Sequence, residues 1–456
     1  MANAAMLQAV LLDGMPIERP VPMKWERLKA APLWTERMVQ ALEVRAQEGW
    51  FSLKDKMCSD VALSRAWARV RANAGAPGVD GVTVERFERN LDERLSRLQQ
   101  ALRDGSFQPQ AIRRVEIPKA DGGMRGLGIP SVVDRVAQAA VLETIEPIFE
   151  HAFDDASYGF RPGRSCKDAL RAVQQGLDEG LCHIVDADLQ RYFDTIPHAK
   201  LMSRVFHYIK DGSVLDLIER FVKAKVTGEL GTRRPEQGTP QGAVLSPLLA
   251  NLYLHPLDQL LRASGYRLVR YADDFVVMCS SQASAVKALE LIQVWVVQAG
   301  LALHPEKTRL ADLTQHGGYI DFLGYRFERH NDKLRRRIKP KKLTALKAKI
   351  KALTPRSSGT SMAEIIRRLN ETLRGVFEYF KHVSTLGRHG ATELDLLDGR
   401  VRFRLRRLLG KRCARLLSGR SLKSHQQWSN QYFHDLGLYS LHVARLSFMR
   451  PHSGHI

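Results

Sequence analysis

Hydrophobic residues at helical spacing dominate the first quarter of the chain. Ser59 is a typical N-cap for a helix whose apolar face carries Leu63, Trp67 and Val70, and the Gly- and Pro-rich segment AGAPGVDG ends it. A second helix is predicted to open at Thr83, with one apolar face formed by Phe87, Leu91, Leu95, Leu98 and Leu102. A weaker pattern favours a helix over 35–47. Residues 1–55 otherwise show little periodicity, and we predict a leader of unassigned role.

Alternating apolar and polar residues then predict strands. The segment RRVEIPKADGGMRGLGIP indicates a hairpin around a DGG turn, and helical patterns follow over 132–149 and 165–179. The apolar run 181–185 predicts a buried strand. After two further helical stretches, the tight loop GTPQG leads into a long apolar helix.

A second hairpin is predicted by RLVRYADDFVVM, which spans 267–278. A helix over 282–299, a strand near 308–310 and the strand-like segment GGYIDFLGYRF come next. Beyond Pro340 the pattern is helical and basic to about residue 418, with a break at 354–361. We find no internal repeats.

The charge of the chain is concentrated in this last part. Lys and Arg number 70 against 49 Asp and Glu, a formal net charge of +21. Residues 333–420 hold 25 Lys and Arg against 6 Asp and Glu, a net charge of +19. Such a concentration favours a surface for a polyanion, nucleic acid before membrane. A solvated basic surface is the alternative.

The five cysteines, Cys58, Cys166, Cys182, Cys279 and Cys413, are widely spaced and form no C-x-x-C pair. This spacing favours neither a disulfide framework nor a zinc ribbon and fits a reducing compartment. The N-terminus lacks a basic n-region, and no run of about 18 apolar residues is present. We therefore expect a soluble cytoplasmic protein with no membrane partner.

Aspartates interrupt two of the predicted strands. Asp273 and Asp274 lie in the middle of the second hairpin, where the pair taken alone could be a solvated turn. Asp186, Asp188 and Asp194 follow another apolar strand, and neighbouring strands of one sheet would bring the two groups together. Clustered carboxylates repel one another unless a cation neutralises them, and Mg²⁺ binds carboxylate and phosphate oxygens. Two such ions suit phosphoryl transfer on a nucleic acid.

These residues carry a resemblance. VDADLQRYFD resembles motif A of reverse transcriptases, RYADDFVV resembles their motif C, and TPQGAVLSPLLAN is similar to the intervening PQG motif, in the same order. The segments GAPGVDG, IPKADGGMRGLGIPSVVDRVAQ, SYGFRPGRS, LHPEKT and FLGYRF resemble further blocks of bacterial group II intron-encoded reverse transcriptase/maturases. The resemblance extends from about residue 60 to 420.

The resemblance implies the catalytic residues. Asp188, Asp273 and Asp274 match the catalytic carboxylates that hold two Mg²⁺ ions, with Mn²⁺ as a substitute. Asp186 and Asp194 would then be structural.

It also implies a site for the incoming dNTP. Lys119, Arg125 and Arg113 would hold the triphosphate, for which a point charge and a planar donor fork are suited. Gln241 would lie beside the nascent base pair. Phe193 matches the aromatic residue that excludes a 2′-hydroxyl, and core packing is its alternative.

Contacts with primer and template are implied for Gly242, where the backbone can approach closely, and for Gly324 and Tyr325. Lys307, in LHPEKT, is either a proton donor to pyrophosphate or a surface lysine.

The implied fold is α+β, a right-hand polymerase with fingers and palm (an antiparallel sheet packed on helices) followed by an α-helical thumb, called domain X. We predict a leader over 1–55, an N-terminal extension over 56–110, fingers and palm over 111–330, a basic thumb over 331–425, and a short C-terminal segment over 426–456 that could be a remnant DNA-binding region.

The implied function is that of an RNA-directed DNA polymerase that copies intron RNA by two-metal-ion nucleotidyl transfer. As a maturase it would also bind that RNA to promote splicing and retrohoming. The implied partners are group II intron RNA, an RNA template with a DNA primer, a DNA target and dNTPs, met in the cytoplasm or at the nucleoid. Since no cysteine pairs follow the thumb, we expect the form without an H-N-H endonuclease, with a primer made elsewhere.

Two alternatives belong to other classes. One is a domesticated reverse transcriptase in DNA repair or phage defence. The other is an RNA-binding splicing cofactor that no longer polymerises, against which Asp188, Asp273 and Asp274 count because all three carboxylates are present.

Overall fold

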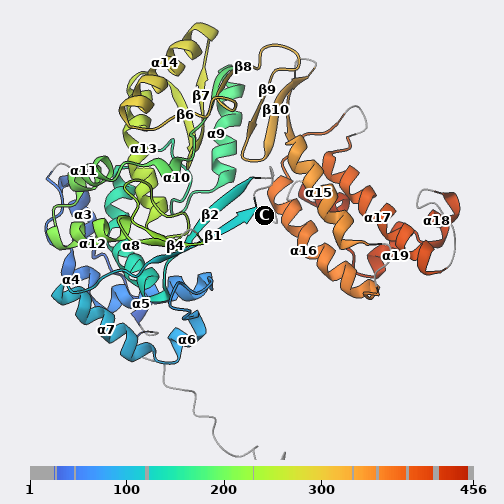
Figure 1. The fold of residues 1–456 in the computed structure, drawn as a ribbon. Helices are drawn as coiled ribbons and strands as arrows, with labels where there is room; N and C mark the ends of the chain where they lie inside the picture. Colours follow the sequence, from blue (N-terminus) through green and yellow to red (C-terminus); the bar gives the residue numbers. More distant parts are fainter. Residues whose placement is uncertain are drawn as a thin grey trace, which may run out of the picture.

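The computed structural model describes residues 25, 28–45, 48–118, 123–229, 231–330, 333–355, 359–386, 390–413 and 421–449. A large body holds the first three quarters of the chain, and a helical lobe made by the residues after 340 extends from it (Figure 1). No helix in these described ranges is long and apolar enough to cross a membrane.

The N-terminal part of the body is helical: α3 (Glu36–Arg45), α4 (Lys54–Met57), α5 (Asp60–Asn73), α6 (Val84–Glu88), α7 (Leu91–Asp104) and α8 (Val132–Ala152). Ser59 is the N-cap of α5, and its side chain accepts a hydrogen bond from Ala62 N at 3.1 Å, as predicted. The single helix predicted from Thr83 is wrong. The backbone at Asn90 leaves the helical region (φ −122°, ψ 43°) and separates α6 from α7, while the predicted apolar residues remain buried on both pieces.

The predicted fingers hairpin is confirmed. Strands β1 (Ile112–Pro118) and β2 (Met124–Ile129) pair antiparallel, with Arg113 opposite Ile129 and Ile117 opposite Arg125. The sheet continues through β4 (Val226–Gly228), parallel to β1, and β5 (Gly231–Arg233), in the order β2-β1-β4-β5.

The palm is a second four-stranded sheet, in the order β6-β7-β3-β8. Its strands are β3 (His183–Asp188), β6 (Arg267–Tyr271), β7 (Asp274–Cys279) and β8 (Arg309–Asp312), so the first begins two residues after the predicted 181–185 run. The surrounding helices are α9 (Cys166–Asp178), α10 (Tyr192–Thr195), α11 (His198–Tyr208), α12 (Gly212–Val222), α13 (Ser246–Ala263) and α14 (Gln282–Gln298).

Both faces of the palm sheet are buried. Side chains alternate along a strand, so Val185 and Val277 join a core with α8 and α13, whereas Ile184 and Val276 join a second core with α9 and the helical lobe. The sheet is thus clamped between two cores, which restrains the strand ends that carry the aspartates.

A three-stranded sheet links palm and lobe. It contains β9 (Tyr319–Phe322), β10 (Tyr325–His330) and β11 (Lys333–Ile338), in the order β11-β10-β9. The domain boundary predicted at 330/331 falls between β10, which ends at His330, and β11, which begins at Lys333.

The lobe consists of α15 (Pro340–Leu353), α16 (Met362–Phe380), α17 (Glu393–Arg412), α18 (Leu422–Gln427), α19 (Asn430–Asp435) and α20 (Leu441–Met449). The predicted helix break falls between α15 and α16, but the three short helices from 422 onward were not predicted. The fingers hairpin, the palm sheet and the helical lobe predicted as the thumb together confirm the predicted α+β fold (Figure 1).

Candidate active site

A two-residue turn presents the adjacent aspartates. Tyr271 pairs with Asp274 across β6 and β7, so Ala272 and Asp273 form the turn between them. Ala272 has a positive φ of 60°, the conformation that tight hairpins require at the first turn residue. Gly159 packs against this turn, and a Cβ there would lie 2.4 Å from Ala272 N. The hairpin was predicted; the supporting glycine was not.

The register of the palm sheet brings in the third carboxylate. β3 and β7 pair antiparallel with Asp188 directly opposite Asp274. Burial raises the pKa of Asp274 to about 7, and the neighbouring carboxylates of Asp186, Asp188 and Asp273 add to the shift. Burial also raises the pKa of Asp273, with Asp188 adding to the effect. These side chains from two strands therefore form one interacting group, as predicted from the sequence.

Cations lie beside this group. Lys307 Nζ is 2.8 Å from Asp188 Oδ2. Lys307 is thus a half-exposed lysine that lies beside the carboxylates, and its role as a proton donor stays a prediction. Lys307 and Arg125 also oppose the raised pKa of Asp273.

The donor set is suited to a divalent cation. Buried carboxylates that repel one another are stabilised by a hard cation, and Mg²⁺ needs few protein ligands when phosphates and water supply the others. Within the described part of the chain, no three His, Cys, Asp or Glu side chains are arranged to hold one metal ion. A cation here would therefore take ligands from its substrate as well.

Asp186 is next to the three central carboxylates, since it adds to the raised pKa of Asp274, whereas Asp194 is paired elsewhere. Asp186 Oδ2 accepts a hydrogen bond from Arg309 Nε at 3.3 Å, and burial raises its pKa to about 6. Asp194 Oδ2 is 3.8 Å from Arg191 Nε and lines a cleft beneath the fingers.

Arg270 is a buried residue that sequence reasoning missed. Its side chain has no exposed surface, and its Nε and NH2 donate to the two carboxylate oxygens of Asp258 at 2.7 and 2.5 Å. NH1 donates to Asn251 Oδ1 and to the Ala272 carbonyl, both at 3.0 Å. Burial opposes the charge of Arg270, but Asp258 outweighs it and raises the pKa of the guanidinium. Arg270 therefore anchors the aspartate turn; its position inside an apolar strand was the available signal.

The fingers hairpin lies over the PQG loop. Arg125 Nε donates to Gln241 Oε1, and Gly128 N donates to the Gln241 carbonyl at 2.7 Å. Gly242 has a φ of 109°, and a Cβ there would lie 2.5 Å from the Gly128 carbonyl. Only glycine fits this approach.

Two other predicted fingers residues have different outcomes. Arg113 shares a strand face with Arg125 by register, and its buried Nε has no hydrogen-bond partner among the described residues. Lys119 lies outside the described residues.

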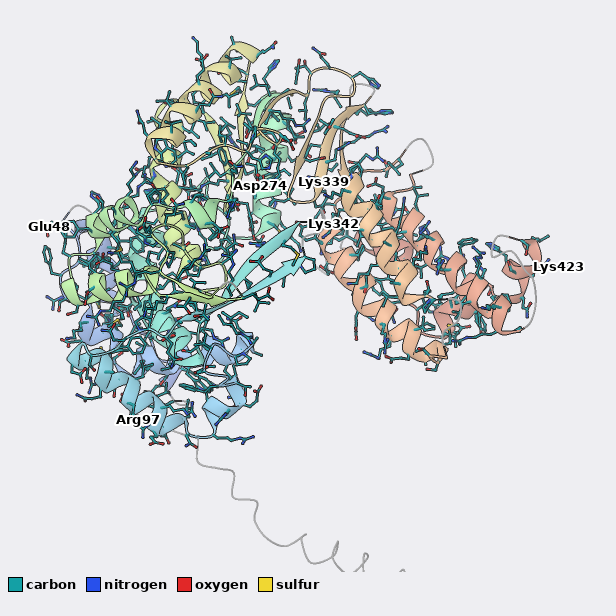
Figure 2. The ribbon with its side chains drawn as sticks, in the orientation of Figure 1. Glu48, Arg97, Asp274, Lys339, Lys342 and Lys423 are labelled. Carbon is teal, nitrogen blue, oxygen red and sulfur yellow. The ribbon has the colours of Figure 1, made fainter. Side chains whose placement is uncertain are left out.

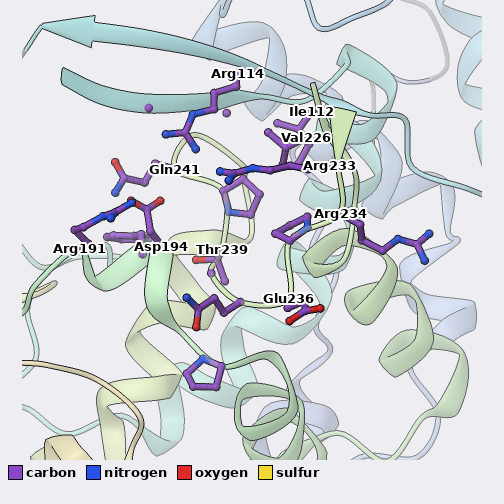
Figure 3. Close-up of a pocket in the computed structure, with 18 residues that line it drawn as sticks. Ile112, Arg114, Arg191, Asp194, Val226, Arg233, Arg234, Glu236, Thr239 and Gln241 are labelled. Carbon is purple, nitrogen blue, oxygen red and sulfur yellow. The ribbon is translucent and has the colours of Figure 1, made fainter. Parts of the chain in front are cut away.

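Phe193 lies at the wall of the cleft beneath the fingers. It is 7% exposed and packs edge-on to Phe160, so it belongs to the core and lines the cleft at once. The cleft has a volume of about 620 Å³. Four of its lining residues are arginines, Arg114, Arg191, Arg233 and Arg234, and Gln241 lines it too (Figure 3). Asp188, Asp273 and Asp274 are not among its lining residues, so the cleft does not enclose the carboxylates.

Gly324 and Tyr325 lie at the palm–thumb junction. Gly324 has a φ of 79°, and the Tyr325 side chain is 1% exposed. Tyr325 Oη donates to the Tyr379 carbonyl, while Tyr379 Oη donates to the Leu323 carbonyl at 2.7 Å. The Tyr325 ring therefore ties β10 to α16.

Comparison with known proteins identifies the family. Residues 117–327 match the family described as "Reverse transcriptase (RNA-dependent DNA polymerase)". "Protein YkfC" of Escherichia coli K12 is 35% identical over 295 residues, which cover 56% of this chain and 77% of YkfC. The chain belongs to the reverse transcriptase family. As a reverse transcriptase it is an RNA-directed DNA polymerase by class, and the family uses divalent metal ions.

A second match identifies the subgroup of this reverse transcriptase. Residues 343–428 match "Group II intron, maturase-specific domain". "Group II intron-encoded protein LtrA" of Lactococcus lactis subsp. cremoris is 38% identical over 197 residues, which cover 43% of this chain and 33% of LtrA. This reverse transcriptase is thus of the group II intron maturase type, with RNA among its partners. It spans only a third of the length of LtrA.

Similar solved structures include telomerase from Candida albicans in complex with a fragment of telomeric RNA, at a TM-score of 0.41 and 14% identity, covering 66% of this chain and 59% of that one. A partial Cas6-RT-Cas1–Cas2 complex has a TM-score of 0.35 and 24% identity, covering 54% of this chain and 42% of that one.

Proposed function

We propose that this reverse transcriptase extends a DNA primer on intron RNA with two Mg²⁺ ions, and that it binds the same RNA as a maturase to promote splicing and retrohoming. The observation that carries the polymerase proposal is the register of β3 and β7, which pairs Asp188 with Asp274 beside Asp273. The maturase proposal rests on the match of residues 343–428.

In this proposal each part of the site has a separate task. Asp188, Asp273 and Asp274 would hold the two metal ions, which stabilise the attacking and leaving oxygens of the phosphoryl transfer when bound. Arg125, with Lys119 and Arg113, binds the triphosphate, and Gln241 positions the new base pair beside the close backbone contact at Gly242. Lys307, paired with Asp188, can donate a proton to the departing pyrophosphate.

The primer contact in this proposal comes from the backbone around Gly324 and Tyr325. The Tyr325 ring is buried against α16, so its side chain positions the strand rather than touching nucleic acid.

A primer-extension assay tests the polymerase proposal. The purified chain is mixed with an RNA template, an annealed DNA primer, dNTPs and Mg²⁺. Extension to the template end is expected, and EDTA should abolish it. A chain that binds the primer–template but adds no nucleotide in Mg²⁺ or Mn²⁺ would contradict the proposal.

Replacing Phe193 with Ala is expected to admit ribonucleotides. Phe193 lines the cleft beside Gln241, where removing the ring opens room for a 2′-hydroxyl. Incorporation of rNTP relative to dNTP should rise about tenfold to a hundredfold, the effect expected of a lost steric contact in a pocket. The measurement is the ratio of kcat/KM for the two substrates.

Phe160→Ala is the matched control, because Phe160 packs edge-on to Phe193 but does not line the cleft. It should leave the ratio of kcat/KM unchanged. If Phe193→Ala lowers stability without changing sugar selectivity, Phe193 is a core residue only.

Affinity for nucleic acid should fall steeply with salt. Each phosphate neutralised by the basic thumb contributes about −0.7 to −0.9 to the slope of log K against log salt. With a net charge of +19 over 333–420, several contacts are expected. Fluorescence anisotropy of a labelled intron RNA fragment at increasing KCl measures the slope. A flat profile would mean that the charge is a solvated surface.

A further inference from the structure

A second basic cleft lies on the thumb. Its lining residues come from α15, α17, α18 and α19, and its volume is about 450 Å³. We call it the thumb cleft and define it by Lys347, Arg400, Arg402, Phe403, Arg406 and His425, with Asn430 at one end. Figure 1 places α17, α18 and α19 on the side of the thumb away from the fingers hairpin. The thumb cleft is therefore separate from the polymerase site.

A buried arginine forms its floor. Arg406 is 3% exposed, and its Nε donates to the Trp428 carbonyl at 2.9 Å. Its NH2 donates to Asn430 Oδ1 at 2.9 Å, and NH1 is 3.5 Å from His425 Nε2. These partners orient the guanidinium but bring no negative charge to it.

Arg406 has no carboxylate partner within the described part of the chain. Burial lowers its pKa, and Arg402 adds to that effect because both are cations. A buried charge without a counter-charge is costly and is normally compensated by an anion. Arg270 in the palm, which is paired with Asp258, shows the usual arrangement. A ligand could therefore supply the negative charge that the described residues do not bring to Arg406.

The rim adds further cations and an aromatic ring. Lys347 and Arg400 line the cleft without a carboxylate partner among the described residues, whereas Arg402 is held by Asp398. Among the residues that the structure describes, no carboxylate lines the cleft. Phe403 lines the cleft as well, with the Arg407 guanidinium 5.5 Å from its ring centroid, and an aromatic ring is suited to stacking with an unpaired base. Phosphate-binding cations beside an aromatic side chain are typical of single-stranded nucleic-acid sites.

We propose that the thumb cleft binds a phosphate and an adjoining unpaired nucleotide of an RNA strand that is not the primer–template. RNA is favoured because all lining residues except Asn430 lie within the maturase-specific match, 343–428. The inference rests on the proposed maturase function and assigns it a surface.

The test fills the polymerase site first. The full chain is saturated with an unlabelled primer–template, and binding of a labelled single-stranded RNA oligonucleotide to that complex is measured. The variant Lys347→Glu/Arg400→Glu reverses two rim charges and leaves buried Arg406 intact, so folding should be retained. We expect about tenfold or greater loss of affinity for the second RNA and a salt slope shallower by about 1.4, at about 0.7 for each contact with a single strand. Primer extension should be unchanged.

Lys349→Glu/Lys423→Glu is the matched control. It makes the same charge change on α15 and α18, at exposed residues outside the cleft, and Figure 2 shows Lys423 at the end of the thumb far from Asp274. An equal loss of affinity for the second RNA in this control would overturn the proposal, because the RNA would then be attracted by the overall basic charge of the thumb and not by the cleft. A parallel loss of primer extension in the cleft variant would assign the cleft to the primer–template instead.

Two further results are decisive. An equal effect on DNA of the same length would overturn the assignment to RNA. If the wild-type chain extends no primer, the polymerase proposal fails. Binding of the labelled RNA still tests the proposal that the thumb cleft is an RNA-binding site.

Discussion

Primer extension by the Asp273→Asn variant is expected to fall by about 10³-fold or more while RNA binding stays intact. Removing one charged ligand of a metal-assisted phosphoryl transfer costs several kcal/mol of transition-state stabilisation, and each 1.36 kcal/mol is about tenfold in rate. Asp273 is the turn residue beside Asp274 and interacts with Asp188. Single-turnover extension and RNA affinity, measured on the same preparation, check the result.

Asp155→Asn is the control for this substitution. Asp155 pairs with Arg164 on the surface and is 89% exposed, so extension should be unchanged. If Asp273→Asn instead lost RNA binding as much as extension while remaining folded, the proposed division between palm and thumb would be wrong. Assisted splicing of a group II intron RNA by Asp273→Asn should likewise continue.

Replacing Asp258 with Asn is expected to lower the free energy of unfolding of the palm by about 3–5 kcal/mol, because it leaves Arg270 buried without its counter-charge. The loss should also disturb the aspartate turn, since Arg270 NH1 holds the Ala272 carbonyl. Urea unfolding monitored by tryptophan fluorescence measures the stability.

The double variant Asp258→Leu/Arg270→Met should recover much of that stability, because removing both charges of a buried pair is often close to neutral. Glu179→Ala is the surface control. Glu179 pairs with Arg267, which lies on β6 like Arg270, and both side chains of this pair are partly exposed. Losing this ion pair should lower the free energy of unfolding by less than about 1 kcal/mol. If the urea concentration at the midpoint of unfolding is the same for Asp258→Asn and the wild-type chain, the buried ion pair does not anchor the turn.

Local patterns were sufficient for much of the fold. The antiparallel pairing of β1 with β2, the hairpin around ADD, the Ser59 cap and the break after α15 all depend on neighbouring residues, and each is present. The split of the helix after Thr83 was missed because its apolar spacing continues across Asn90. The short helices α18, α19 and α20 were missed because each is too brief for a clear period.

The sequence by itself determined the candidate chemistry of this reverse transcriptase: Asp188, Asp273 and Asp274 lie at the ends of apolar strands, in motifs that resemble those of the family. Only the tertiary structure decided how that chemistry is supported. The register of β3 against β7, the pairing of Lys307 with Asp188, the Asp258 partner of Arg270 and the hydrogen bond from Arg406 to Trp428 join residues distant in the chain. Hydrophobic periodicity predicts which face of a helix or strand is buried. It does not predict which charged residues pair, because the pairing depends on how the elements pack against one another.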